Sequence, residues 1–377
     1  MKKIALIIDI KYDAGGGLGM CLTKINYIKK LNLQKILIVT TYKSTFDYLK
    51  KKYNISSLFY KKNLLIPRLI NFLSKKIPLL TSDFQRFLIK KEVEKIFFLS
   101  PSYLNILIKK MNYIYTVWDL SHLEKKLEEL PEHESSVRKT RDNSYSSAAK
   151  YAKFIVIGTK ENKLKFEENY KLNDNNIIVS KFPPYICSIN TENRNISSIS
   201  ENYLLYPAQY WEHKNHKYLI KFFEDYQFDK YIKNISLVCT GFDKGNHNYL
   251  KNLIKEKNLQ NRITLLNYIE DEQLRFMYKN SIGIVFPSLI GSHSFPLYEA
   301  FYFRKPVFYN KDILSREFSE YVNLIDINST KSFYDQLIKN FNKNKTKELT
   351  DRAEIKFQEI FNEKKILMNL ETMIREV

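Results

Sequence analysis

The most constraining feature of this chain is the alternation of short apolar runs with longer amphipathic stretches. A short apolar run is typical of a buried strand, and an amphipathic stretch with helical spacing is typical of a surface helix. Alternation of the two predicts a parallel sheet with helices on both faces. The first series predicts strands at Lys3–Asp9, Lys35–Thr40, Ile96–Leu99, Tyr113–Val117 and Phe154–Ile157, and helices at Leu22–Leu31 and Thr45–Tyr53.

A second series of the same kind begins at Tyr203. Between the two lies Asn190–Asn202, which is rich in Asn, Ser and Thr and is typical of a linker. We therefore expect two domains, with a boundary near residue 195, and one long helix over Glu354–Val377. The second series predicts strands at Tyr203–Tyr206, Ser236–Thr240, Ile263–Leu266, Gly283–Phe286 and Pro306–Tyr309, with helices at His216–Phe223, Tyr249–Lys257, Glu272–Asn280 and Leu297–Phe303.

Four of the nine glycines lie together in Gly15–Gly19, between the first expected strand and the first expected helix. Glycine lets a backbone approach a ligand closely, and a helix N-terminus favours anions. The segment does not match the dinucleotide-binding GxGxxG pattern, and no acidic residue follows about 20 positions later. The pattern favours a ligand-contacting turn over a dinucleotide site, and a simple tight turn is the alternative.

The formal charge of +20 over 377 residues bears on partners rather than on the fold. Nucleic acid, an anionic membrane face and a phosphate-bearing substrate all fit it. Within the basic segment Lys43–Lys95, the apolar run Asn63–Leu73 is flanked by lysine pairs, a pattern that suits an anionic membrane surface. A solvated basic face over core helices is the alternative interpretation.

The remaining composition indicates a reduced, cytoplasmic protein. The three cysteines are far apart and show no metal-ligand spacing, which is typical of a reducing compartment. No apolar stretch reaches about 18 residues, so we expect no transmembrane helix. The opening apolar run ends at Asp9 and is too short for a secretory signal. The six histidines form no metal-binding pattern, and we expect no metal or cofactor.

Three segments of the second half carry a family signal: Tyr206–His216, Leu237–Gly241, and Asn267–Ile269 with Asp271–Leu274 continued by Val285–Ser288 and Gly291–Ala300. In order and spacing they resemble the donor-binding half of glycosyltransferase family 4, the retaining group 1 glycosyltransferases. The resemblance is close over Tyr203–Tyr309 and looser in the first half, through the glycine-rich turn and Trp118–His122. It implies an α/β protein of the GT-B fold, with two Rossmann-like domains, parallel sheets and an interdomain cleft.

The resemblance implies a set of donor-binding residues. Lys214 matches the family lysine that holds the donor diphosphate, whereas Gln209 replaces an arginine and can only donate a hydrogen bond. Glu299 matches the second of two glutamates and would accept hydrogen bonds from ribose hydroxyls. Gly291 stands where the first glutamate is often found, so that part of the mechanism is not carried over. The other expected donor contacts are Gly241, Asn267, Tyr268, His293, Ser294, Phe295, Pro296 and Leu297.

Acceptor contacts are expected from the first half. Asp119 and His122 follow the strand Tyr113–Val117, which places them at the carboxyl edge of the first sheet. The resembled family has a His or Asp near here that meets the transferred sugar or acceptor, so Asp119, His122, Lys214 and Glu299 form the expected catalytic set. A helix-capping Asp and a surface His are the alternatives. Acceptor-binding candidates are Gly15, Gly16, Gly17, Arg138 and Arg141.

The function implied is metal-independent transfer, with retention, of a mannose- or rhamnose-like sugar from a nucleotide diphosphate sugar to a glycan. The expected domains are 1–195 for the acceptor and 196–354 for the donor, with a helix over 355–377 packing back on the first. Cytoplasmic location and the basic first domain favour a lipid-linked acceptor at the inner membrane face, in bacterial surface polysaccharide or lipopolysaccharide biosynthesis. Two alternatives remain: an inactive glycosyltransferase-like binding subunit, and a nucleic-acid-binding protein, for which no module motif occurs.

Overall fold

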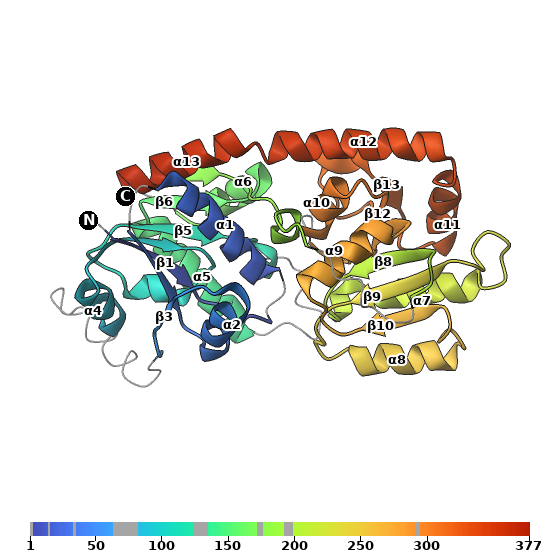
Figure 1. Cartoon of the computed structure of the whole chain (residues 1–377), viewed down its shortest axis with the longest axis horizontal. Coiled ribbons are helices and arrows are strands. Elements are labelled where there is room, and N and C mark those ends of the chain that lie inside the picture. The colour runs from blue at the N-terminus through green and yellow to red at the C-terminus, as the bar shows by residue number, and fades with distance from the viewer. Residues whose placement is uncertain are drawn as a thin grey trace. The chain divides into compact units, whose positions relative to one another are not determined.

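The chain folds into two compact units, which are described separately (Figure 1). The computed structural model describes residues 3–13, 16–32, 35–62, 82–123, 135–171, 176–191, 199–291 and 295–377. Unit 1 holds the described residues up to 123 together with residues 135–183 and 361–377, and unit 2 holds residues 184–360. Each unit contains one sheet, and the chain returns to unit 1 at its C-terminus.

Unit 1 contains a seven-stranded sheet in the order β3-β2-β1-β4-β5-β6-β7, and its paired strands run parallel. Chain order reverses between β1 and β4, and ligands bind at the carboxyl edge beside such a reversal in open α/β sheets. The strands are β1 (Lys3–Ile8), β2 (Lys35–Thr40), β3 (Leu58–Phe59), β4 (Val93–Phe98), β5 (Tyr113–Val117), β6 (Phe154–Ile157) and β7 (Asn176–Val179).

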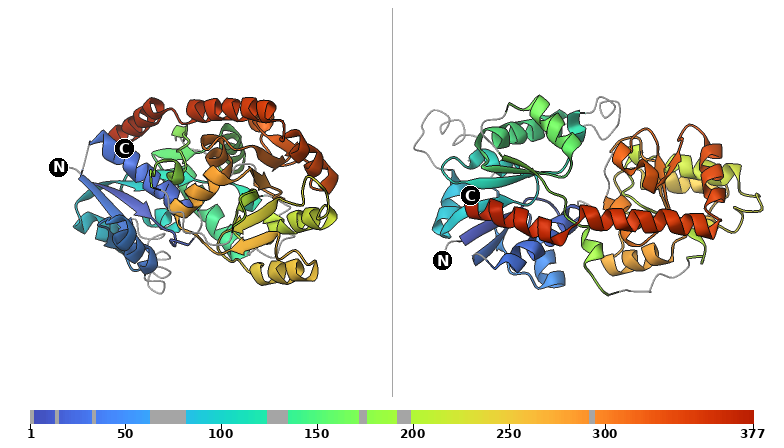
Figure 2. Two further views of the ribbon diagram at one scale, coloured as in Figure 1. Left: turned by 45° about the vertical axis from the view of Figure 1, so that its right-hand side comes forward. Right: turned by 90° about the horizontal axis from the view of Figure 1, so that it is seen from above.

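Helices cover both faces of this sheet, as expected for buried parallel strands (Figures 1 and 2). One face packs against α4, α5 and α6 in a core that includes Phe98, Tyr115, Tyr145 and Phe166. On the other face α1 packs on β1, and the C-terminal helix packs on α1. The helices of unit 1 are α1 (Gly17–Leu31), α2 (Lys43–Tyr53), α4 (Asp83–Lys90), α5 (Ser135–Tyr151), α6 (Lys160–Asn169) and α13 (Glu363–Glu376), with 3₁₀ turns η1 (Tyr103–Leu107) and η2 (Ser121–Leu123).

Unit 2 contains a six-stranded parallel sheet in the order β10-β9-β8-β11-β12-β13. The reversal lies between β8 and β11, so the loops that follow these two strands share one edge of the sheet. The strands are β8 (Tyr203–Pro207), β9 (Ser236–Thr240), β10 (Ile263–Leu266), β11 (Gly283–Phe286), β12 (Val307–Asn310) and β13 (Asn323–Ile325). The helices are α7 (His216–Asp225), α8 (His247–Glu256), α9 (Asp271–Asn280), α10 (Phe295–Tyr302), α11 (Thr330–Lys339) and α12 (Lys343–Ile360), with 3₁₀ turns η4 (Tyr185–Cys187), η5 (Glu212–Lys214) and η6 (Arg316–Tyr321).

The expected single C-terminal helix is wrong, because the tail forms two helices. The first, α12, ends at Ile360 and packs on α10 of unit 2, whereas α13 packs on α1 of unit 1. Asn362 separates them as an N-cap, with its side chain accepting a hydrogen bond from the Lys365 amide. The Nζ atom of Lys95 donates to the Ile374 carbonyl at 2.5 Å, which holds the C-terminal end of α13 beside β4.

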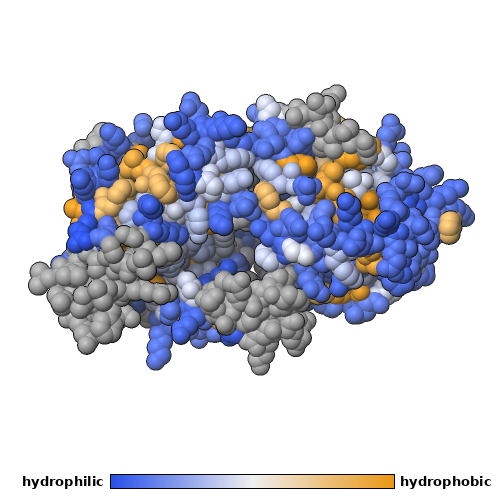
Figure 3. All heavy atoms as spheres, turned by 90° about the horizontal axis from the view of Figure 1, so that it is seen from below, coloured by the Kyte–Doolittle hydropathy of each residue, from blue (hydrophilic) through white to orange (hydrophobic). Residues whose placement is uncertain are grey.

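In the part of the chain that the structure describes, no helix is long and apolar enough to cross a bilayer. The face drawn in Figure 3 is mostly hydrophilic where described residues are coloured, with apolar side chains in separate groups. The apolar run Asn63–Leu73, expected as a membrane contact, lies outside the described residues.

Candidate active site

In unit 2, the loop after β8 is tied to the loop after β11. The Tyr206 hydroxyl donates to the carbonyl of Lys214 at 2.7 Å and lies 3.1 Å from the Ser288 hydroxyl. Asn215 has φ of 56°, a left-handed conformation that Asn tolerates, and its side-chain amide donates to the Pro287 carbonyl at 3.1 Å. Lys214 is thereby positioned at the edge where the two loops meet.

A backbone contact completes this junction. The Leu289 amide donates to the His213 carbonyl at 2.8 Å, so the two loops share a main-chain hydrogen bond. The resulting frame joins the β8–α7 loop, which carries Gln209 and Lys214, to the β11–α10 loop, which leads into Glu299. In the sequence Glu299 follows Lys214 by 85 positions and Gln209 by 90, and the parallel topology brings their loops together.

Gly241 follows β9 and lies directly against the Gln209 segment. A Cβ at this position would lie 2.5 Å from the Ala208 carbonyl oxygen and 2.8 Å from the Gln209 Cα, so only glycine fits. The side-chain oxygen of Gln209 accepts a hydrogen bond from the Trp211 indole at 2.9 Å. Its Nε2 atom is buried and has no partner among the described residues. That amide is therefore the part of Gln209 that can donate to a ligand.

Asn267 and Tyr268 follow β10 at the same edge. The Thr240 hydroxyl donates to the Asn267 carbonyl at 2.8 Å, which fixes this turn beside β9. The Tyr268 ring stacks on Phe242 with centroids 4.5 Å apart and planes 11° apart, and 36% of Tyr268 is exposed. The sequence predicted that this turn contacts the donor base mainly through its backbone. In the structure the Tyr268 ring is also exposed.

The loop before α10 is only partly described. Gly291 has φ of 94°, which favours glycine, and its carbonyl accepts a hydrogen bond from the Tyr309 hydroxyl at 3.2 Å. His293 and Ser294 lie outside the described residues. The first two residues of α10 are Phe295 and Pro296, and Pro296 has no amide hydrogen to donate to a ligand.

Glu299 lies on α10 and is partly buried. The Tyr278 hydroxyl donates to its Oε2 atom at 2.6 Å. Removal from water raises the pKa of Glu299 to about 7; the Tyr278 hydrogen bond opposes this shift, and the nearby Asp271 charge adds to it. The carboxylate is therefore poised near its protonation midpoint at neutral pH.

The sequence did not single out His216, which lies inside this site. His216 is 2% exposed and packs between the rings of Tyr206 and Tyr210. Burial, with a further contribution from Lys214, lowers its pKa to about 3, so the imidazole is neutral. Neither ring nitrogen has a partner among the described residues. Its ring neighbours, Tyr206 of β8 and Tyr210 of the β8–α7 loop, precede it closely in the sequence, but no motif among them marks the histidine as a site residue.

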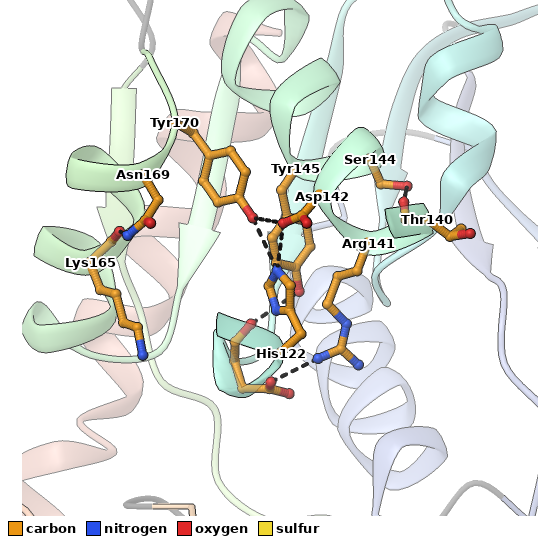
Figure 4. A network of polar contacts seen from close by, with 10 residues as sticks. His122, Thr140, Arg141, Asp142, Ser144, Tyr145, Lys165, Asn169 and Tyr170 are labelled. Carbon is orange, nitrogen blue, oxygen red and sulfur yellow. Dashed lines mark hydrogen bonds and ion pairs between the residues drawn. The ribbon is translucent and has the colours of Figure 1, made fainter. Parts of the chain in front are cut away.

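Unit 1 holds the remaining candidates. Asp119 follows β5, and Arg141 of α5 donates to its Oδ1 atom at 2.9 Å. The Tyr145 hydroxyl donates to the Asp119 carbonyl at 3.2 Å. Arg138 lies one helical turn before Arg141 on α5 and is partly exposed. The structure therefore pairs two of the predicted acceptor residues directly, and Figure 4 shows this network.

His122 is buried, whereas the sequence predicted a side chain that meets the sugar or the acceptor at the edge of the sheet. It is 4% exposed, and its Nε2 lies 3.1 Å from the Asp142 carboxylate and 3.0 Å from the Tyr170 hydroxyl (Figure 4). Burial and the neighbouring Arg141 lower its pKa, which favours a neutral ring. Nδ1 has no partner among the described residues. Its role in catalysis stays a prediction.

The glycine-rich turn lies beside this group. Gly15 falls outside the described residues, whereas Gly16 is exposed and immediately precedes α1. Gly17 is buried, and a Cβ there would lie 2.5 Å from the Trp118 ring. Close packing on Trp118 accounts for the glycine at position 17, and it places the start of α1 next to the Asp119 segment.

No group of three or more His, Cys, Asp or Glu side chains suited to a metal ion occurs in the described ranges. Asp119 and His122 lie in unit 1, and Lys214 and Glu299 lie in unit 2, so the expected catalytic set is divided between the two units.

Comparison with known proteins supports the sequence resemblance. Residues 190–356 match the family model described as glycosyl transferases group 1, which confirms that resemblance over the second half. No curated protein matches the chain by sequence.

Solved structures match along nearly the whole chain. A glycosyltransferase from Rickettsia africae is 17% identical with a TM-score of 0.67, covering 99% of this chain and 97% of that one. Sucrose-phosphate synthase from Thermosynechococcus elongatus is 15% identical with a TM-score of 0.73, covering 100% and 99%. Anabaena HepE in complex with UDP-glucose is 15% identical with a TM-score of 0.70, covering 100% of both chains. At these identities the likeness shows the fold, which is GT-B.

Proposed function

We propose that this chain, which carries a group 1 glycosyltransferase domain on the GT-B fold, is a retaining glycosyltransferase that uses a nucleotide diphosphate sugar. The observation that carries the proposal is the junction of the β8–α7 and β11–α10 loops. It ties the loop that carries Gln209 and Lys214 to the loop that leads toward α10, inside the region that matches the family, and this supports the proposal. Cations and helix N-termini both favour phosphate.

In this proposal the donor diphosphate lies at the junction. Lys214 and the Nε2 amide of Gln209 bind it, and Glu299 accepts hydrogen bonds from the ribose. The base lies near Asn267 and Tyr268, whose exposed ring offers a stacking surface. UDP is the first nucleotide to test, because Anabaena HepE was solved with UDP-glucose. The mannose- or rhamnose-like sugar remains a prediction from the sequence.

The reaction breaks the bond between the anomeric carbon and the β-phosphate oxygen and forms a bond from that carbon to an acceptor oxygen. The departing β-phosphate oxygen takes up the proton of the acceptor hydroxyl, and the nucleoside diphosphate leaves with it. Charge on the leaving phosphate is stabilised by Lys214 and by the amides at the start of α10. This arrangement supports our proposal of metal independence, since it supplies positive potential from the protein.

The acceptor is proposed to bind in unit 1 beside Asp119, Arg141 and Arg138. The guanidinium of Arg141 is partly exposed and suits a phosphate or a sugar hydroxyl. A lipid-linked glycan of a bacterial surface polysaccharide or lipopolysaccharide pathway would carry both a phosphate and sugar hydroxyls. The glycine-rich turn at Gly16 lies near this group through the contact of Gly17 with Trp118.

Contact of unit 1 with an anionic membrane face, from the cytoplasmic side, fits such an acceptor. Lys43, Lys50 and Lys51 are exposed on α2. Each basic residue near an anionic surface contributes about 1 kcal/mol of attraction. Flotation with phosphatidylglycerol vesicles tests this: we expect binding that is lost at high salt, and equal binding to neutral vesicles would contradict it.

Turnover of labelled donors tests the enzyme assignment. We expect release of labelled sugar from one nucleotide sugar, with and without Mg²⁺, and a loss of at least about 100-fold in Lys214→Ala if one phosphate contact stabilises the transition state. Lys217→Ala is the matched control, since Lys217 lies on α7 and pairs with Glu212 on the surface. Nucleotide binding without turnover of any donor would favour the inactive subunit instead.

A further inference from the structure

Buried Tyr278 and partly buried Glu299 form a hydrogen-bonded pair within unit 2. Tyr278 lies on α9 and is fully buried, and Glu299 lies on α10. Their oxygen atoms are 2.6 Å apart, a distance typical of a strong hydrogen bond to a carboxylate. Tyr278 bonds to Oε2 of the carboxylate, and among the described residues no hydrogen bond reaches Oε1.

The Tyr278 ring is held firmly, so its hydroxyl has a fixed position. The ring stacks on Phe303 with centroids 5.3 Å apart and planes 18° apart. One residue earlier, the carbonyl of Met277 accepts a hydrogen bond from the Tyr203 hydroxyl at 2.8 Å, which anchors α9 to the start of β8. A supporting group with a locked rotamer is what an oriented binding carboxylate requires.

We propose that Tyr278 is a positioning residue for donor binding: its hydroxyl fixes the Glu299 carboxylate through Oε2 and leaves Oε1 to receive the donor ribose. The inference rests on the proposed function, in which Glu299 binds the ribose. Tyr278 itself does not touch the donor. Its effect is carried by the orientation and by the ionisation of Glu299.

Four titratable or charged side chains lie on the elements packed around the Glu299 carboxylate. From α9, Tyr278 donates to Glu299 and lowers its pKa, whereas Asp271 raises it. From η4, Cys187 lies near Glu299, and its own pKa is raised well above the ordinary value by burial and by Glu299, so the thiol is neutral. Arg275, also on α9, lies near Cys187 and donates to the Ile186 carbonyl at 3.1 Å.

The direction of the effect follows from these groups. Burial alone favours the protonated carboxyl, and the Tyr278 hydrogen bond favours the ionised form. Without the phenol hydroxyl, the pKa of Glu299 rises above 7, and the carboxyl is protonated at neutral pH. A donor that binds the ionised carboxylate then binds less well at pH 7 and recovers at higher pH.

The test is the affinity for UDP between pH 5.5 and 9, measured by calorimetry on the full chain. We compare wild type, Tyr278→Phe, Tyr203→Phe and Glu299→Gln. At each pH the affinity of a protein for UDP is divided by the affinity of Glu299→Gln. This ratio removes the effect of the titration of the UDP phosphate. Tyr203→Phe is the matched control, because it also deletes a buried phenol hydroxyl bonded to α9 without touching Glu299.

We expect a midpoint near pH 7 in wild type and in Tyr203→Phe, and a midpoint about one pH unit higher in Tyr278→Phe. Weakening of Tyr278→Phe by the same factor at every pH indicates a structural role only and overturns the proposal. So does a wild-type profile that matches Glu299→Gln. If wild type binds no nucleotide at any pH, the proposed function fails first, and the inference fails with it.

Discussion

Lys24 offers a quantitative test of the unit 1 core. It lies on α1 and is 1% exposed, and its ammonium donates to the Leu99 carbonyl at 3.1 Å and to the Thr116 hydroxyl at 2.9 Å. Among the described residues no carboxylate pairs with it. Burial lowers its pKa from 10.5 to about 8, an effect opposed by the nearby Cys21.

The magnitude follows from linkage. Between pH 8 and 10.5 the unfolded chain holds more protons at Lys24 than the folded chain, so the free energy of unfolding rises with pH. Each pH unit contributes about 1.4 kcal/mol, which gives about 2 kcal/mol between pH 8 and 9.5. Lys24→Met removes this dependence, and the titration of other groups cancels when the two proteins are compared.

The two tryptophans allow unit 1 to be followed on its own. Trp118 lies in unit 1 and Trp211 lies in unit 2, so Trp211→Phe leaves fluorescence that reports unit 1. In this background, urea unfolding is measured from pH 7 to 9.5 for the protein that keeps Lys24 and for the Lys24→Met variant. The difference in unfolding free energy between the two proteins is expected to change by about 2 kcal/mol. A difference that stays constant with pH would refute the account of Lys24.

Two further substitutions test the frame of the donor site. Gly241→Ala is expected to weaken nucleotide binding at least tenfold, because its Cβ would lie 2.5 Å from the Ala208 carbonyl, and calorimetry checks this. Gly158→Ala, where a Cβ meets nothing within 4 Å, is the control, and equal affinities would contradict the expectation. Tyr206→Phe removes the hydrogen bonds that join Lys214 to the β11–α10 loop. It should raise KM for the donor and cost about 1 kcal/mol in thermal unfolding, and an unchanged KM would count against the junction.

The central strands could be predicted well because they are continuous apolar runs. Tyr113–Val117, Ser236–Thr240 and Gly283–Phe286 have the same bounds in the structure as in the prediction. Strands buried on both faces carry this pattern strongly. The edge strands Asn176–Val179 and Asn323–Ile325 were not predicted, because their apolar runs are only three and two residues long; each pairs with one neighbouring strand.

The break in the C-terminal tail shows a different limit. Helical periodicity continues across residue 362, so the pattern predicted one helix over Glu354–Val377. In the structure the first helix ends at Ile360. The helix before this break packs on α10 of unit 2, and the helix after it packs on α1 of unit 1. An Asn followed by Glu363 is an N-cap signal that could have marked the break.

The expected site residues lie where a loop follows a central strand, and their roles stay predictions. Lys214, Gly241 and Glu299 were identified in this way, together with the family resemblance. Their partners were not, because Tyr278 and Tyr206 reach the site through contacts between distant segments. Residues of that kind have no local pattern, and only the folded arrangement of strands and loops reveals them.

Nucleotide binding tests the central claim most directly. Thermal unfolding is followed with UDP, GDP, dTDP and ADP, each with and without Mg²⁺, for wild type, Lys214→Ala and Glu299→Ala. We predict stabilisation by one nucleotide, equal with and without Mg²⁺ and lost in both variants; at 100 times Kd it amounts to about 2.7 kcal/mol. No stabilisation by any nucleotide, or a full shift retained in Lys214→Ala, would contradict a donor site at the junction of the β8–α7 and β11–α10 loops.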